Sequence, residues 1–282
     1  MSRTLLRNSA LCIVLGSAAA MPARAADPAP AATDQIGSIA ICEDENEWPP
    51  YSYFQRKQGK PTRQVVGYAV DVIDEIFKRH QIAYHIDMIP WNRCMAVAAL
   101  GKEYQLVFNL SYNPERLKTF LFSRAYYATT TYYFYSRRNN PTGLAIKAPG
   151  DVKKYRICGV RGYNYTGYGL APGDVDQGSG DFTALVAKLQ LGRCALFLEK
   201  KEIMAGYAAI GRDYLADPDI ASAPVPGVRP SLFYYGVSRN YALAPALMRI
   251  IDDELLTMES SGRLHELWAK AAPKLVRAAM TP

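Results

Sequence analysis

Histidine, long apolar runs and clusters of like charge are scarce in this sequence, and each shortage argues against one class of site or function. The three histidines are far apart and no two cysteines have the spacing of a zinc site, so we expect no metal and no cofactor. No run of five like charges occurs, and the net charge of +7 is dispersed along the chain, which argues against nucleic-acid binding. Beyond the first 20 residues, no long apolar stretch predicts a membrane span.

The first 25 residues have the three parts of a secretory signal peptide. Arg3 and Arg7 give a positive start, residues 11–20 form a short apolar run, and Ala23-Arg24-Ala25 supplies small residues at the spacing that signal peptidase reads. The apolar run is shorter than the roughly 20 residues that span a bilayer. We therefore expect residues 1–25 to be a signal peptide and the mature protein to be a soluble periplasmic one.

Four cysteines remain when Cys12, in the apolar run, is set aside. They are Cys42, Cys94, Cys158 and Cys194. An even number in an exported chain predicts disulfides, because the compartment is oxidising. Four cysteines permit three pairings, and the sequence alone does not choose among them. Our hypothesis is Cys42–Cys94 and Cys158–Cys194, because each of these pairs lies within one of the two units described next.

The apolar pattern of the mature chain has the order of an α/β protein. In the first unit, strands are predicted at 36–41, 82–89 and 106–110, and helices at 67–80 and 91–100. In the second unit and the tail, strands are predicted at 156–160 and 195–198, and helices at 181–191, 244–259 and 262–271. This alternation is typical of open α/β sheets.

Extended aromatic segments at 126–135 and 221–238 lie between the two units. They predict that the chain builds most of one lobe, crosses to a second lobe, and returns. We expect lobe one at 36–128 plus 232–282, and lobe two at 129–231. Ligands of open α/β sheets lie outside the carboxyl ends of the strands, so two such lobes that face each other would form a cleft that closes by a hinge.

Four segments carry a resemblance to a known family. They are Gly67-Tyr-Ala-Val-Asp71, residues 109–116 (Asn-Leu-Ser-Tyr-Asn-Pro-Glu-Arg), Phe122-Ser123-Arg-Ala-Tyr126, and the closing strand and helices from Tyr235 to Trp268. In order and spacing they resemble the family 3 periplasmic solute-binding proteins, the polar amino-acid receptors of uptake systems. The resemblance implies the two-lobed type II periplasmic-binding-protein fold, an α/β fold with hinge crossovers.

Arg116 is the candidate for binding a carboxylate. It follows a Pro-Glu step after a predicted strand, at a predicted helix start, where a planar guanidinium can hold a carboxylate by two parallel hydrogen bonds. A surface ion pair with Glu115 is the alternative. The resemblance places the family's carboxylate-binding arginine on Arg116, and implies that Asn109 and Ser111 offer backbone or hydroxyl groups to the ligand.

Aromatic and turn residues complete the predicted site. The resemblance implies stacking aromatics at Trp48 and Trp91, although buried aromatics usually belong to a core. On the second lobe, a polar segment follows a strand and is expected to open a helix, where free N–H groups favour an anion. This segment consists of Arg161, Gly162, Tyr163 and Asn164. An ordinary glycine turn is the alternative.

The second lobe departs from the family in charge. After the strand that corresponds to 195–198, the family usually has an acidic residue that binds the ligand's ammonium group, and the matching position here is Lys200, beside Glu199. Adjacent strand residues point to opposite faces, so we expect only one of them to face the ligand. If Lys200 does, it joins Arg116 and Arg161 around an anionic ligand. If Glu199 does, an amino acid is bound and Lys200 begins a solvated helix.

The resemblance implies a monomeric protein that captures a small carboxylate-bearing, amino-acid-like solute and delivers it to the membrane permease of an ABC transporter. One alternative is a periplasmic dehydratase of the same fold, similar to the cyclohexadienyl dehydratases. Such an enzyme needs a general acid or base held in the cleft, and nothing visibly positions Glu43 or Glu199 for that role, so we expect no enzyme. The other alternative is a ligand-binding sensor or accessory protein.

Overall fold

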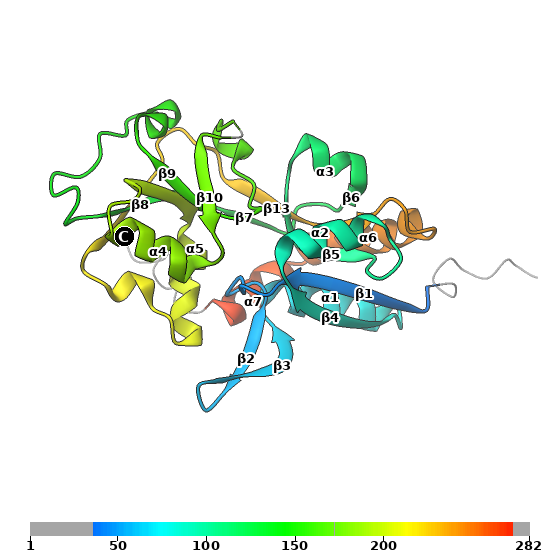
Figure 1. Ribbon diagram of the computed structural model, residues 1–282. Coiled ribbons are helices and arrows are strands. Elements are labelled where there is room, and N and C mark those ends of the chain that lie inside the picture. The colour runs from blue at the N-terminus through cyan, green and yellow to red at the C-terminus, as the bar shows by residue number, and fades with distance from the viewer. Residues whose placement is uncertain (1–35, 172, 273–282) are drawn as a thin grey trace, which may run out of the picture.

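Two α/β lobes, each built around its own sheet, make up the computed structural model, which describes residues 36–171 and 173–272 (Figure 1). The predicted signal peptide and Cys12 lie outside the described residues. The strands are β1 (Ser38–Asp44), β2 (Tyr53–Lys57), β3 (Lys60–Val66), β4 (Ala83–Ile89), β5 (Leu106–Ser111), β6 (Phe120–Phe122), β7 (Tyr127–Thr129), β8 (Thr131–Ser136), β9 (Ile157–Val160), β10 (Val175–Ser179), β11 (Leu196–Lys200), β12 (Ile220–Pro224) and β13 (Ser231–Ser238). The α-helices are α1 (Tyr68–Arg79), α2 (Trp91–Ala99), α3 (Pro114–Thr119), α4 (Phe182–Gln190), α5 (Lys201–Gly206), α6 (Ala244–Ser260) and α7 (Arg263–Ala271). None of the described helices is long and apolar enough to span a membrane.

The sheet of the first lobe has the order β4-β1-β5-β13-β6, with β7 also paired to β13. β1 runs parallel to β4, and the pairing continues until Glu43 lies opposite Met88 and Asp44 lies opposite Ile89. The strand therefore continues beyond the predicted 36–41 and includes Glu43 and Asp44. This parallel partner extends a segment whose local polarity favours a loop, and it places two carboxyl groups at the carboxyl end of β1.

The sheet of the second lobe has the order β10-β9-β11-β8-β12. Its edge strand β10 lies between the predicted strand 156–160 and the predicted helix 181–191, where no strand was expected because Val-Asp-Gln-Gly-Ser has no apolar alternation to reveal it. The helix expected to open at Arg161 does not form. Gly162 has a left-handed φ of 78°, which ends β9 in a turn, and only a short 3₁₀-helix follows at Thr166–Tyr168.

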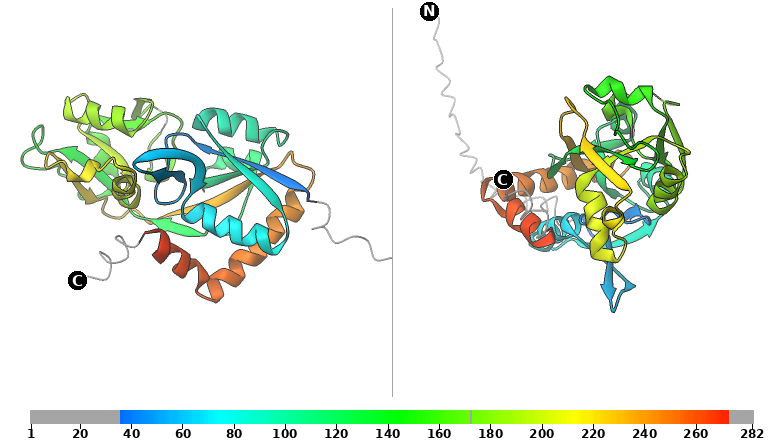
Figure 2. Two further views of the ribbon diagram at one scale, coloured as in Figure 1. Left: turned by 90° about the horizontal axis from the view of Figure 1, so that it is seen from below. Right: turned by 90° about the vertical axis from the view of Figure 1, so that its left-hand side faces the viewer.

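The chain passes between the two sheets twice. On the way out, only Thr130 separates β7 from β8. On the way back, residues 225–230 connect β12 to β13. In Figure 1, β7 and β13 run side by side between the lobes, and Figure 2 shows the same division from two further directions.

A stack of aromatic rings links the C-terminal helix to these crossovers. The Trp268 ring of α7 lies 5.3 Å from that of Tyr51, the Tyr51 ring 3.9 Å from that of Tyr127, and the Tyr127 ring 4.7 Å from that of Phe233 on β13. Stacked rings add to the free energy gained by burying their area. The returning end of the chain is thereby packed against the segment that leaves the first lobe.

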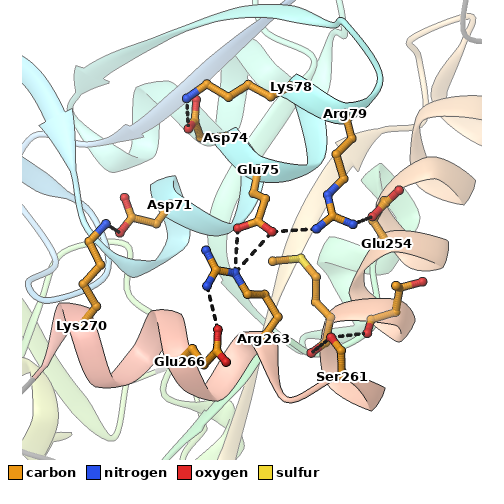
Figure 3. A network of polar contacts seen from close by, with 12 residues as sticks. Asp71, Asp74, Glu75, Lys78, Arg79, Glu254, Ser261, Arg263, Glu266 and Lys270 are labelled. Carbon is orange, nitrogen blue, oxygen red and sulfur yellow. Dashed lines mark hydrogen bonds and ion pairs between the residues drawn. The ribbon is translucent and has the colours of Figure 1, made fainter.

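Ion pairs hold the last two helices against α1 (Figure 3). Glu75 of α1 accepts from Arg79 at 2.8 Å and from Arg263 of α7 at 3.0 Å, and Arg79 also reaches Glu254 of α6 at 3.2 Å. Single exposed pairs contribute little, but several that share charges form a network whose contribution falls with added salt. The network fixes the position of α7 and therefore of Trp268.

The four cysteines pair as hypothesised from the sequence. The Cα atoms of Cys42 and Cys94 are 5.6 Å apart, and those of Cys158 and Cys194 are 5.7 Å apart, both within the range of a disulfide. Each bond lies within one lobe: the first joins β1 to α2, and the second joins β9 to the residue two positions before β11.

We predict that neither disulfide couples the lobes. Cys158→Ser/Cys194→Ser should lower the free energy of unfolding by about 2–4 kcal/mol, because it releases loop entropy to the unfolded chain, and should leave ligand affinity unchanged. Denaturant unfolding and calorimetry on the same preparation would test this. Free thiols found by peptide mapping of the non-reduced protein, or a Cys94–Cys158 link, would contradict the assignment.

Candidate ligand-binding cleft

A cavity of about 550 Å³ lies between the lobes and takes its walls from both. Nine of the residues predicted for the site line it: Trp48, Trp91, Asn109, Ser111, Arg116, Tyr163, Asn164, Glu199 and Lys200. Arg161 and Gly162 do not. The wall also includes residues that the sequence did not single out for binding, among them Glu43, Asp44, Tyr168, Ser231 and Phe233.

Local sequence places Arg116 in the first turn of α3. The side chain of Asn113 caps this helix by accepting the backbone N–H of Glu115 at 2.8 Å, and Pro114 occupies the first turn, where its missing N–H costs nothing. Glu115 pairs with Lys118 at 2.7 Å. The alternative reading, an Arg116–Glu115 pair, is therefore not what the structure shows.

The guanidinium of Arg116 faces the cavity without a carboxylate partner in the described part of the chain. It donates to the backbone oxygen of Ser111 at 3.2 Å and to its Oγ at 3.1 Å, and its Cζ lies 5.8 Å from the centre of the Trp91 ring. Burial lowers the pKa of Arg116 to about 10. A cation held in this way favours an anion that the protein itself does not supply.

The side-chain amide of Asn109 is fully hydrogen-bonded within the protein. Its Nδ2 donates to Glu43 and to Ser52, each at 2.8 Å, and its Oδ1 accepts the phenols of Tyr126 and Tyr127, each at 2.9 Å. The backbone is left-handed, with φ 51°, a conformation that asparagine tolerates better than most residues. Although Asn109 borders the cavity, its amide is used to hold Glu43 in place.

Three buried carboxyl groups line the cavity. Glu43 is 1% exposed, and Asp44 and Glu199 are each 3% exposed. Burial is the largest cause of the shift in each case, and it raises the pKa of Glu43 to about 8, that of Asp44 to about 6 and that of Glu199 to about 7. Glu43 and Asp44 could have been found from the sequence, since they directly follow a predicted strand at the edge where open sheets bind ligands.

Glu199 and Lys200 both line the cavity, so the expectation that only one of them would do so is wrong. Alternation along β11 sets the direction of each Cβ, but the long stem of Lys200 brings its Nζ to the hydroxyls of Thr131 and Ser231, each at 3.2 Å. Lys200 is 3% exposed and α5 begins at Lys201. The solvated-helix reading therefore applies to Lys201 and not to Lys200.

The predicted cluster of three cations is also not formed. Arg161 is exposed and outside the cavity wall, and Gly162 packs against the side chain of Asn92 on the opposite lobe. Arg116 and Lys200 instead share the cavity with the exposed Arg229, which the sequence did not single out, and with the three carboxyl groups. The cleft is thus of mixed charge.

Direct hydrogen bonds connect the lobes beside the cavity. The phenol of Tyr163 donates to Asp44 at 2.8 Å, and the amide of Asn164 donates to Ser111 Oγ at 3.0 Å and to the backbone oxygen of Tyr112 at 2.8 Å. The ring of Tyr163 also meets that of Trp48 edge-on, with centres 5.3 Å apart. The two sides of the cleft are therefore in contact in this conformation.

Comparison with solved structures identifies the same fold. An amino-acid ABC transporter substrate-binding protein from Streptococcus pneumoniae, bound to L-arginine, aligns with a TM-score of 0.64 at 16% identity over 86% of this chain and 97% of that one. The arginine-, lysine- and histidine-binding protein ArtJ from Geobacillus stearothermophilus aligns with 0.63 at 19% identity over 85% and 98%. A histidine kinase sensor domain similar to periplasmic binding proteins gives 0.65 at 16% identity over 84% and 96%.

No curated protein sequence matches the chain significantly. Residues 40–273, however, match the family of bacterial extracellular solute-binding proteins, family 3. This is a family of solute-binding proteins, which agrees with the binding role expected from the sequence. Since the match covers most of the sequence, the chain belongs to the bacterial extracellular solute-binding proteins of family 3.

Proposed function

We propose that this protein captures a small carboxylate-bearing, amino-acid-like solute in the cleft between its lobes. The observation that carries the proposal is Arg116, a half-buried guanidinium that faces the cavity, lies beside Trp91, and has no carboxylate partner among the described residues. A ligand carboxylate would complete its hydrogen bonds and offset its charge. The binding role of the family supports the same conclusion.

The proposed route is periplasmic uptake. The signal peptide expected at residues 1–25 would export the protein, and the monomer would then deliver its solute to the membrane permease of an ABC transporter. Several proteins of similar structure are substrate-binding proteins of amino-acid ABC transporters, which supports this role. The family as a whole is extracellular.

Capture would involve rotation of one lobe against the other. We propose that residues 36–128 plus 232–282 and residues 129–231 move as two units about the crossovers at Thr130 and 225–230. The bonds from Tyr163 to Asp44 and from Asn164 to Ser111 would then belong to the closed form. Hinge closure around a ligand is a common motion of two-lobed binding proteins.

The first prediction concerns Arg116. A thermal-shift screen of L-amino acids and dicarboxylates would identify binders, because a ligand of the native state raises the melting temperature. Arg116→Ala should then weaken binding of the best solute by at least about 2 kcal/mol in calorimetry, since it leaves the carboxylate unpaired. Arg161→Ala, which removes an exposed arginine outside the cavity, should bind as wild type. Equal affinity of Arg116→Ala and wild type would contradict the proposal.

The second prediction concerns closure. A Cβ at Gly162 would overlap Oδ1 of Asn92 across the cleft, so Gly162→Ala should disfavour the closed form and weaken binding about tenfold without touching the ligand. Gly211→Ala is the matched control, because Gly211 has a similar φ of 81° and open space around it. Asn92→Ala in the Gly162→Ala background should restore affinity. Equal affinities in the Gly162 and Gly211 variants would show that this contact plays no part in closure.

The third prediction concerns pH. Burial raises the pKa of Glu199 from 4.5 to about 7, so between these values the folded protein holds a proton that the unfolded chain has lost. The free energy of unfolding must therefore fall as pH rises through this window. Glu199→Gln, whose amide oxygen can still accept the N–H of Lys200, should gain stability relative to wild type by about 3 kcal/mol between pH 4 and pH 8. If the free energies of unfolding of wild type and Glu199→Gln changed in parallel with pH, this prediction would be contradicted.

A further inference from the structure

Three hydroxyl groups surround the ammonium of Lys200. Its Nζ lies 3.2 Å from Thr131 Oγ1 and 3.2 Å from Ser231 Oγ, and it also contacts the phenol of Tyr168. Lys200, Ser231 and Tyr168 line the cavity, whereas Thr131 lies behind them in β8. The hydroxyls come from three separate parts of the chain, namely the first residue of β8, the first residue of β13 and the 3₁₀-helix after β9.

The hydrogens of these hydroxyls have no acceptor in the described structure. An ammonium has three donors and no lone pair, so each hydroxyl oxygen must accept from it, and each hydroxyl keeps its own O–H to donate elsewhere. Within residues 36–171 and 173–272, none of the three donates to a protein acceptor. The O–H groups of Ser231 and Tyr168 border the cavity, so a bound molecule there could accept from both.

The charge of Lys200 is also without a direct partner in the described residues. The carboxyl group of Glu199, next in sequence, instead accepts the backbone N–H of Lys200 at 2.8 Å, and burial raises its pKa to about 7. Glu202 directs one carboxyl oxygen toward the backbone of Thr130. Neither forms an ion pair with Nζ, and a buried cation without one is costly unless a ligand supplies the negative charge.

We propose that Lys200, Ser231 and Tyr168 form a second anion subsite, so that the solute carries two anionic groups. This rests on the proposed function, in which Arg116 takes the first group. The second group is rich in oxygen acceptors, as a carboxylate, phosphate or sulfonate is, because it must accept from two hydroxyls beside a cation. Trp48, Trp91 and Phe233 in the same cavity suit an apolar body between the two groups. A ligand ammonium beside Lys200 is disfavoured.

Pairs of solutes that differ in one anionic group test this subsite. The probes are L-glutamate with L-glutamine, terephthalate with 4-carbamoylbenzoate, and O-phospho-L-serine with L-serine, so that the carboxylate and phosphate forms are examined separately. Wild type should bind at least one dianionic member at least tenfold more tightly than its partner. Both members of a pair keep the carboxylate for Arg116, so this ratio reports the second subsite alone.

Variants assign the preference to Lys200. Lys200→Met removes the charge with little change in length and should bring the ratio close to one, whereas Lys201→Met, the exposed neighbour, should leave it unchanged. Ser231→Ala and Tyr168→Phe should each lower it several-fold. The proposal is overturned if wild type binds the neutral member equally well or better, or if Lys200→Met keeps the ratio. Unchanged binding in Arg116→Ala would instead defeat the proposed function, whatever the ratio.

The melting temperature of the unliganded protein provides a second test of the subsite. Lys200→Met should melt a few degrees higher than wild type in the absence of solute, because it removes a buried charge that lacks a partner. Adding the preferred solute should narrow this difference, because it should raise the melting temperature of wild type more than that of Lys200→Met. A lower melting temperature for Lys200→Met, together with no response of wild type to any dianion, would show that the lysine is only structural.

Discussion

The amide of Asn109 is the contact on which the first lobe's side of the cleft depends. Its four hydrogen bonds join Glu43 at the end of β1, Ser52 after the adjoining loop, and two tyrosines at the first crossover. Because the group is buried, the loss of Glu43 or Ser52 would leave one N–H of Nδ2 without an acceptor. The position of Glu43 and the path of the crossover are therefore fixed by the same side chain. Through Tyr127, Asn109 is also connected to the C-terminal helix α7, since the Tyr127 ring is part of the aromatic stack that reaches Trp268.

The cleft contains buried charged groups without ion-pair partners, an arrangement that would be costly in a hydrophobic core. Arg116 and Lys200 have no ion pair in the described residues, while three carboxyl groups nearby have pKa values raised by burial. Replacing such groups by apolar ones often stabilises a protein. That they lie together in a cavity between two lobes is what a binding site requires, because a ligand can then provide the missing partner and stabilise the form that holds it.

Much of the fold could be predicted from local patterns. The period of the apolar residues located α1 and α2, and the order of strands and helices indicated two α/β units. The position of Arg116 at a helix start was also predictable from the Pro-Glu step before it, whereas its role as the carboxylate-binding residue came from the family resemblance. What the sequence could not show depends on contacts between distant segments. The partner strand β4 extends β1 through Glu43 and Asp44, a left-handed Gly162 leaves Arg161 outside the cavity, and a flexible stem lets Lys200 reach the cavity beside Glu199. Neither alternation nor composition contains that information.

The longer crossover has a further property. Residues 227–230 belong to the connection between β12 and β13 and also line the cavity, as does Ser231, the first residue of β13. In the proposed closure, a solute in contact with Ser231 would therefore lie directly beside the segment that bends. Substitutions in 225–231 would change two quantities together, the intrinsic affinity of the closed cleft and the fraction of molecules that are closed before any ligand arrives. These two quantities could be separated only by measuring the equilibrium between open and closed forms in the absence of ligand. Substitutions in the crossover itself could therefore adjust affinity during evolution without altering any group that recognises the solute.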